Sequence, residues 1–365
     1  MDWGRILNII FFIFAIIGAG DYFLDNKFGL GKEFERGLRT AGTLILCMVG
    51  FMTIAPAVGK VLGPYISPFF VKIGADPSLF AGILLSVDCG GAVTAKELAL
   101  TEDAYILNGF LVASMFGSAL NGNIPLSVAI IKPERRRYVL FGLAIGIISI
   151  PVGCLVGGIL AGMSPRVLWG NLLPLFILSV ILTSSIILFS RVLEKILKVF
   201  GKAMVLICLL GLMVCAAREL CGINFPIEGQ PFSETMNTVG KIVLCLCGVF
   251  PMLGVILNWL RKPISRIAEK TGTSVLDIKC LLMDLVNCFS SIDLLNEMTD
   301  LGILLNCALG IGAGYALGDH FAYVNSTEPR LTIPLILGKL AAGAFSILAV
   351  ALLARFIIKP KEEAK

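Results

Sequence analysis

Ionisable side chains that stand inside long apolar stretches are the residues of this sequence most able to do chemistry. Asp88 lies within one apolar run and is followed by Gly90 and Gly91, and the pair Asp319 and His320 lies within another. A charged group in hydrocarbon is unfavourable, so such residues face a cavity or a partner. A carboxylate beside glycines, where a helix can unwind, offers an anionic group and free carbonyl oxygens to a small cation.

Other polar residues at similar depth complete the candidate substrate site. The predicted substrate-binding residues are Asp88, Cys89, Gly90, Gly91, Asn123, Asn287, Asn306, Asp319 and His320. Structural alternatives remain open for several of them. Asp88 is also suited to a helix cap or an inter-helix hydrogen bond, and His320 to either a proton-linked or a structural role. We expect a structural ion pair between Asp319 and Lys339, and a second between Asp284 and Lys279.

Metal and nucleophile chemistry find little support in the sequence. Nearly all of the 11 cysteines lie in apolar runs, where they are typical small buried hydrophobes, and there is no CxxC pair. The single histidine cannot build a multi-histidine metal site. The sequence contains no HExxH, GxSxG or GxxxxGK[ST] motif. We therefore expect no cofactor, no structural metal, no enzymatic activity and no ATP hydrolysis.

The composition indicates that lipid is the solvent of this chain. Of its 365 residues, 57% are hydrophobic and only 15% are charged, and the mean hydropathy is +0.92. Soluble chains carry about 25% charged residues. The sequence therefore predicts an all-α polytopic protein of the inner or plasma membrane, surrounded by lipid. The 30 basic and 25 acidic residues give a net charge of +5, which suits basic cytoplasmic loops and not nucleic-acid binding.

The apolar runs predict about eleven transmembrane helices in one transporter domain that covers residues 1–365. Loops between them are short, and the first run is expected to be a retained helix and not a cleaved signal peptide. The predicted spans are residues 5–23, 39–59, 78–95, 104–131, 138–163, 168–190, 199–217, 238–260, 275–295, 301–324 and 331–357.

Basic loops set the expected orientation. Residues 132–137, 191–202 and 261–270 are rich in lysine and arginine, and positively charged loops stay in the cytoplasm. With eleven spans, the N-terminus is then inside and the C-terminus outside. Two segments fit this arrangement poorly: residues 24–38, which carry three basic side chains on the expected outer side, and the tail with Lys359 and Lys361.

The chain matches itself at offsets between 196 and 199 positions. Residues 42–50 align with 240–248, residues 87–89 with 286–288, and residues 117–120 with 314–317. This pattern predicts a duplication, with repeat 1 at about 38–163, repeat 2 at about 236–357, and linking helices at about 168–217. Secondary transporters are commonly built so, with the substrate between the repeats. The repeats run parallel unless one span is re-entrant, and residues 86–92 and 287–291 are places where a helix can unwind.

Several of these stretches together resemble a known family. The run from Asp88-Cys89-Gly90-Gly91 to Lys96-Glu97, the sequence around Asn306, the Gly318-Asp319-His320 element and the segment around Lys339 are similar to the ethanolamine permease family of the ethanolamine-utilisation operon. The similarity extends in order from about residue 36 to 345.

This resemblance implies a permease that imports ethanolamine. A primary amine of this kind is mostly a cation at pH 7, so we expect recognition by a carboxylate, several carbonyl or amide oxygens and a partner for the hydroxyl. Phe289 and Tyr315 are candidate cation-π faces. Transport is facilitated or ion-coupled, with H+ or Na+ as the coupling ion, and small-residue faces are compatible with a homodimer. The alternatives are a secondary transporter of another small amine or amino acid and a membrane scaffold or sensor.

Overall fold

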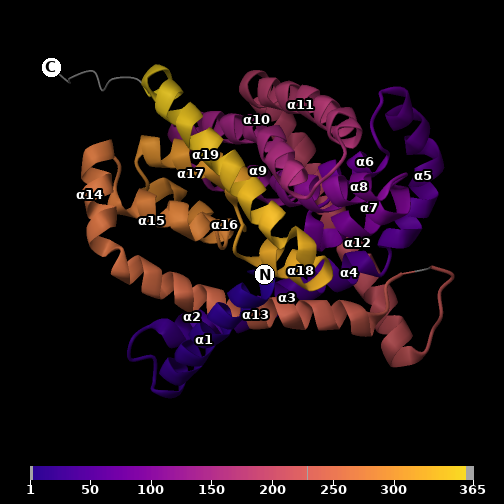
Figure 1. Ribbon diagram of the computed structural model, residues 1–365, viewed down its shortest axis with the longest axis horizontal. Coiled ribbons are helices and arrows are strands. Elements are labelled where there is room, and N and C mark those ends of the chain that lie inside the picture. Colours follow the sequence, from indigo (N-terminus) through magenta and orange to yellow (C-terminus); the bar gives the residue numbers. More distant parts are fainter. Residues whose placement is uncertain (1–2, 228, 359–365) are drawn as a thin grey trace.

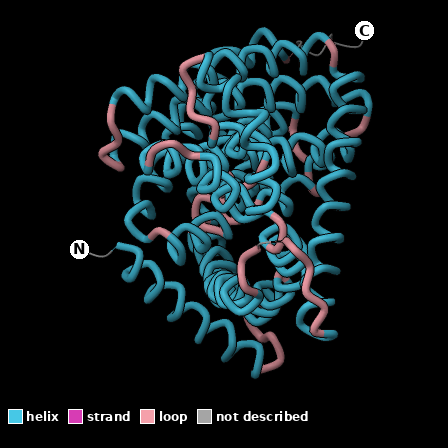
Figure 2. The backbone as a smooth tube through the Cα atoms, turned by 90° about the vertical axis from the view of Figure 1, so that its right-hand side faces the viewer, coloured by secondary structure: helices cyan, strands magenta, loops and turns pink. Residues whose placement is uncertain are grey.

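The computed structural model describes residues 3–227 and 229–358. Within them the chain is 85% helical and has no strands, which confirms the predicted all-α class (Figures 1 and 2). The helices form two groups that pack mainly within themselves, and we call these the first and the second bundle.

The first bundle contains the helices that open each half of the chain. Its members are α1 (Trp3–Phe23), α2 (Leu30–Arg39), α3 (Ala41–Leu44), the π-helical turn η1 (Ile45–Val49), α4 (Gly50–Met52), α12 (Ser190–Cys221) and α13 (Phe232–Trp259). Helices α1, α2 and α13 pack together, and α12 packs on η1 and α4. The backbones of α4 and α12 meet at Gly50 and Gly211, where a side chain on either residue would collide with a carbonyl oxygen.

The second bundle is built around α10 (Arg136–Leu160), α17 (Asp300–Ala313) and α19 (Thr332–Ile357), which make the most extensive helix contacts in the molecule. Against them lies the span Glu102–Ile130, which comprises α8 (Glu102–Ile106), the π-helical segments η3 (Leu107–Gly117) and η4 (Ala119–Asn123), and α9 (Ile124–Ile130). Helix α11 (Pro165–Leu188) covers α10. Small residues let α10 and α19 approach closely, since Gly153 and Gly338 each face the carbonyl of the other.

Residues 78–98 form a re-entrant hairpin, which we call the first hairpin. Helix α6 (Ser78–Leu84) ends at an extended break, and η2 (Val87–Gly91) with α7 (Ala92–Leu98) returns to the starting end. At the base, the Leu100 N–H donates to the Asp76 carboxylate (3.0 Å), which also caps the Ser78 N–H (2.9 Å). The predicted unwinding is confirmed, but the predicted span 78–95 is wrong as a crossing.

A second hairpin has the same plan. Helix α15 (Val275–Asp284) is followed by a turn at 285–286 and the extended residue Asn287, then α16 (Cys288–Ile292) and the 3-10 turn η6 (Leu295–Glu297). At its base the Asp277 carboxylate accepts hydrogen bonds from the Thr299 hydroxyl (2.6 Å) and N–H (3.1 Å). It also accepts the Ser274 N–H (2.7 Å). Residues 275–295, another predicted span, therefore enter and leave at one end.

The predicted span 301–324 is interrupted. Helix α17 ends at Ala313, residues 314–318 are not helical, and α18 (Asp319–Thr327) continues to the 3-10 turn η7 (Pro329–Leu331). Tyr315 has a left-handed backbone (φ 60°). The break is anchored on the tip of the second hairpin, because the Tyr315 and Leu317 N–H groups donate to the carbonyls of Asp284 (2.9 Å) and Leu285 (2.7 Å).

The expected eleven spans are not confirmed. Among the described residues, seven helices are long and apolar enough to cross a membrane, and an eighth span arises if the pair Leu30–Met52 and Ala55–Lys72, bent by 47°, counts as one. The second member of that pair is α5 (Ala55–Lys72), and α13 is similarly followed by the short α14 (Arg261–Thr271). The 3-10 turn η5 (Pro133–Arg135) leads into α10.

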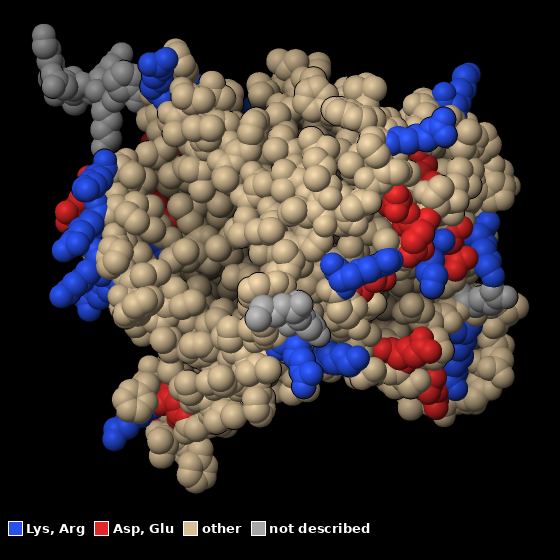
Figure 3. All heavy atoms as spheres, in the orientation of Figure 1, with Lys and Arg blue, Asp and Glu red and all other residues tan. Residues whose placement is uncertain are grey.

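The two hairpins enter from opposite ends of the molecule. The base of the second hairpin lies at a basic end, where Arg135 contacts Asp300 (2.7 Å) and Arg136 contacts Glu194 (2.5 Å). The base of the first hairpin lies at the other end, since the Asp76 N–H donates to Asn171 near the start of α11 (3.0 Å). Figure 3 shows a broad uncharged surface between two charged edges, of which the one at α14 carries mainly Lys and Arg.

These hairpins change the expected membrane topology. Each removes one crossing. With the bent pair and the interrupted α17 and α18 each counted as one crossing beside the seven long helices, nine crossings remain among the described residues. Residues 24–38 and the end of α19 then lie on the side of the three basic loops. Residues 24–38, which fitted the positive-inside rule poorly, are then on the cytoplasmic side with the other basic loops. Lys359 and Lys361 themselves lie outside the described residues.

We predict that the N-terminus is extracellular and the C-terminus cytoplasmic. A green fluorescent protein fused to the C-terminus should fluoresce, because that reporter folds in the cytoplasm, and an alkaline phosphatase fused there should be inactive. Fusions after residue 163 serve as the control with the opposite expected result. Active phosphatase at the C-terminus would contradict this topology.

Candidate functional site

A cavity of about 230 Å³ lies between the two bundles, where both hairpin tips approach the first bundle. Helix η1 and the middle of α12 form one wall. The other wall consists of the first hairpin tip, Phe289 of the second, the turn around Asn121, and the start of α18. The polar lining residues are Thr43, Cys47, Ser86, Asp88, Cys89, Ser118, Asn121, Cys208, Tyr315, Asp319 and His320.

Asp88 is the carboxylate at the tip of the first hairpin. It accepts a hydrogen bond from the Ser86 hydroxyl (2.5 Å), and its Oδ1 lies 3.8 Å from His320 Nε2. The same histidine nitrogen is 3.3 Å from the Ser86 oxygen. Asp88 is 8% exposed and His320 2%, so this trio is almost fully removed from lipid and water. The hairpin tip and the start of α18 are thereby joined at the predicted site.

Aromatic rings form the wall beside this trio. The Tyr315 ring packs on the His320 ring with centroids 4.7 Å apart, and the Phe289 ring packs on Tyr315 at 5.8 Å. The left-handed backbone at Tyr315 turns the chain so that its hydroxyl donates to Asn123 Oδ1 (3.1 Å). The predicted aromatic faces therefore line the cavity that contains the carboxylate.

The predicted ion pair between Asp319 and Lys339 is absent. The fully buried Lys339 ammonium donates to the carbonyls of Ser114 and Gly314, each at 2.7 Å. Gly314 follows the last residue of α17, so its carbonyl has no helical partner and takes the lysine instead. Asp319 lines the cavity and caps its own helix start through the His320 N–H (2.9 Å).

The structure brings together four of the nine predicted site residues, namely Asp88, Cys89, Asp319 and His320. Gly90 and Gly91 do not line the cavity but form the backbone of the hairpin tip, where Gly91 packs on the carbonyls of Leu85 and Ser86. Gly90 has a left-handed backbone (φ 84°) and packs against Phe51, so another residue would be strained and would collide.

The three predicted asparagines have positioning roles near the cavity. Asn287 caps α16 through the Phe289 N–H (3.0 Å), and Asn123 joins Tyr315 to the Gly310 carbonyl (2.9 Å). Asn306 donates to the carbonyls of Asp277 (3.2 Å) and Gly302 (2.8 Å). None of the three lines the cavity itself.

The first bundle contributes residues that the sequence interpretation missed. Cys47 of η1 lines the cavity together with Cys89 of the first hairpin and Cys208 of α12, whose thiol is 3.9 Å from the Cys47 carbonyl oxygen. The sequence groups both Cys47 and Cys208 with the buried apolar cysteines, because a uniformly apolar helix does not reveal which face meets a cavity.

The sequence analysis names Ser86 only as part of a segment that can unwind. Its position two residues before Asp88, where it can hydrogen-bond that carboxylate, was the available signal.

The architecture and the buried polar site define a multi-pass integral protein of the cell membrane with a ligand-sized cavity at its centre. The chain belongs to the family described as "Ethanolamine utilisation protein, EutH", whose sequence model matches residues 4–353.

Named relatives match along nearly their full lengths. The chain is 34% identical to the "Probable ethanolamine permease EutH" of Listeria monocytogenes, covering 100% of this chain and 98% of the relative. It is 30% identical to the protein of the same name in Escherichia coli, covering 100% and 97%. It is 32% identical to the "Uncharacterized protein YxeR" of Bacillus subtilis, covering 93% and 91%. No solved structure matches significantly.

Removal of the Lys339 ammonium should destabilise the fold independently of Asp319. Lys339→Leu leaves two buried carbonyls without a donor, which we expect to lower the free energy of unfolding by about 2–5 kcal/mol. Thermal unfolding of the purified protein in detergent measures this as a lower Tm. Leu337→Ala, at a lipid-exposed position of the same helix, is the control with a smaller effect. A Lys339→Leu/Asp319→Asn double variant that regains wild-type stability would restore the ion-pair interpretation.

Proposed function

We propose that this protein is a permease that imports ethanolamine as its ammonium cation, by facilitated or ion-coupled secondary transport. The names of two relatives that match over their full lengths support ethanolamine as the substrate. The observation that carries the proposal is the Asp88 carboxylate, held at a hairpin tip on the wall of a cavity between two bundles.

The chemistry of the cavity suits a small hydroxy-ammonium ion. Asp88 supplies a negative charge to the ammonium group, and the Tyr315 and Phe289 rings supply faces that attract a cation. Side-chain oxygens of Ser118 and Asn121 are available to the substrate hydroxyl. The two carboxyl groups of the cavity, Asp88 and Asp319, outnumber the one nearby ammonium of Lys339. A monovalent cation is therefore the ligand that balances charge in this region of low dielectric.

The position of the cavity supports alternating access. Its walls belong to different bundles, and the hairpins that close it enter from opposite ends of the molecule. A displacement of the second bundle along the first would move the substrate across the membrane. One hairpin tip would close the cavity to the outside in one conformation, and the other tip would close it to the cytoplasm in the other. Inverted repeats give such a carrier two related conformations.

An inverted arrangement of repeats 38–163 and 236–357 is part of this proposal. The two hairpins give each half the same re-entrant element. Thr101 and Thr299, which the self-alignment pairs, both cap the helix that follows their hairpin. Buried Ser149 and Ser346, which lie at a similar offset, each donate to the carbonyl three residues earlier. With the first hairpin not crossing, the first helix of repeat 2 comes an odd number of crossings after the equivalent helix of repeat 1. The two halves would therefore run in opposite directions.

We expect Asp88→Asn to reduce uptake of radiolabelled ethanolamine into proteoliposomes by about 100-fold, because the cation loses its buried counter-charge. The protein should still elute as a single species in gel filtration. Asp103→Asn, which alters a carboxylate at the surface end of a helix, should retain uptake within about twofold. Normal uptake by Asp88→Asn would remove this residue from the substrate site.

The same assay separates ethanolamine from the alternative substrates. A tenfold excess of unlabelled ethanolamine should abolish uptake of the label, whereas equal amounts of choline or serine should leave most of it. Choline lacks the N–H donors that the Asp88 and Ser86 oxygens would accept, and serine adds a carboxylate near two carboxyl groups. Equal competition by either compound would favour the alternative of a transporter for another amine or amino acid.

A covalent link between the bundles should stop transport. Cys47 of the first bundle and Cys89 of the first hairpin, which packs on η3 of the second bundle, both line the cavity, so copper phenanthroline should oxidise them to a disulfide and abolish uptake until dithiothreitol reduces it. In Cys89→Ser the thiol pair that remains, Cys47 with Cys208, lies within the first bundle. That variant should keep most of its own starting activity after oxidation. Full transport by the cross-linked protein would contradict relative motion at this contact.

A further inference from the structure

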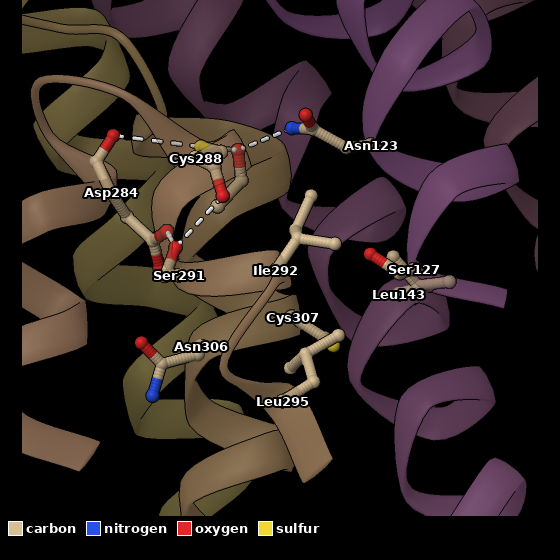
Figure 4. Close-up of a pocket in the computed structure, with 11 residues that line it drawn as sticks. Asn123, Ser127, Leu143, Asp284, Cys288, Ser291, Ile292, Leu295, Asn306 and Cys307 are labelled. Atoms are coloured by element: carbon tan, nitrogen blue, oxygen red, sulfur yellow. Dashed lines mark hydrogen bonds between the residues drawn. The ribbon is translucent and has the colours of Figure 1, made fainter. Parts of the chain in front are cut away.

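A second, much smaller pocket lies between the second hairpin, α17 and the end of η4. Its volume of about 10 Å³ admits one water-sized occupant. Figure 4 shows Asp284, Ser291 and Asn306 on one wall and Asn123 and Ser127 on the facing wall. This pocket is separate from the substrate cavity, with which it shares no residue.

Asp284 brings a carboxylate to this pocket that has no positively charged partner within 4 Å among the described residues. The residue is 2% exposed, and its Oδ1 accepts a hydrogen bond from the Ser291 hydroxyl. Its Oδ2 is buried and makes no hydrogen bond. The expected pair with Lys279 does not form, because five residues along a helix turn the two side chains about 140° apart.

Asn306 places a second unpartnered oxygen beside the same pocket. Its amide nitrogen donates to two carbonyls, at 2.8 and 3.2 Å, which fixes the orientation of the amide group. The remaining Oδ1 is buried and makes no hydrogen bond. Two acceptor oxygens, from a carboxylate and an amide, therefore line one pocket without a donor between them.

An unpaired carboxylate inside a membrane protein requires a positive charge, either a proton or a bound cation. The pocket surrounds Asp284 with further oxygen atoms, from Asn306 and the hydroxyls of Ser127 and Ser291. Oxygen-only donor sets suit hard metal cations, and a single carboxylate balances one charge. We propose that this pocket binds one sodium ion.

The pocket is mechanically connected to the substrate cavity, so the ion would act on transport. The Asp284 carbonyl accepts the Tyr315 N–H (2.9 Å), and the Tyr315 ring packs on His320 in the cavity wall. Sodium bound by Asp284 and Asn306 would join α15 to α17 and fix the position of Asp284, whose carbonyl accepts the Tyr315 N–H. This coupling to uptake rests on the proposed function, whereas the binding of sodium does not.

Sodium binding is tested on the purified full-length protein without ethanolamine. Replacing N-methylglucamine chloride by NaCl at constant ionic strength and pH should raise Tm by about 2–4 °C in a saturable manner, because an ion that binds only the folded state stabilises it. Potassium should have less effect, since the pocket is small. Asp284→Asn should remove the sodium-dependent shift, and Ser127→Ala, a milder change, should move its midpoint to higher sodium.

Asp319→Asn is the matched control, since it removes a carboxylate that lines the other cavity and should keep the sodium shift. No sodium-specific shift in the wild type, or an equal shift in Asp284→Asn, would overturn the sodium site and leave a proton as the partner of Asp284. An inward sodium gradient should also stimulate ethanolamine uptake several-fold in the wild type. A sodium shift in a protein that does not transport ethanolamine would refute the proposed substrate and leave the ion site standing.

Discussion

The requirement that every backbone group freed inside the membrane must find a hydrogen-bond partner shapes the centre of this protein. The helix breaks expose carbonyl and amide groups where water is scarce. Lys339 takes two of the carbonyls, one from each of two neighbouring spans. The Tyr315 and Leu317 amides pair with the tip of the second hairpin, and Asn121 donates to the Leu84 carbonyl at the end of α6 (2.5 Å). Several of the polar residues in apolar stretches therefore serve as hydrogen-bond partners for backbone groups that the helix interruptions leave free.

The same interruptions create the functional groups of the cavity. Because α6 ends at Leu84 and the chain continues extended, Ser86 and Asp88 lie at the start of α18 beside His320. Aspartates at the hairpin bases hold the returning chains together, Asp76 in the first and Asp277 in the second. Each hairpin is thus closed at its base by a carboxylate, and its tip is held by hydrogen bonds from a neighbouring broken segment.

Charge is distributed unequally between the two bundles. The acidic groups at the centre, Asp88 and Asp284 of the two hairpins and Asp319 at the start of α18, and the buried Lys339 of α19 all lie outside the first bundle. The first bundle presents mostly apolar side chains and thiols to the cavity. A surface of this kind makes few directional contacts with its neighbour. Sliding along it breaks few hydrogen bonds, which is the property that a moving carrier needs at its interface.

The sequence by itself determined the membrane class, the candidate residues of the site and the two segments that unwind. Those features follow from hydropathy and from glycine or polar residues in apolar runs, which act locally. Only the tertiary structure decided that residues 78–95 and 275–295 turn back and that Lys339 binds carbonyls and not Asp319. It alone also placed Cys47 and Cys89 in one cavity. An apolar run of the right length is compatible with a span or a hairpin, and the choice depends on partners that are far away in the chain.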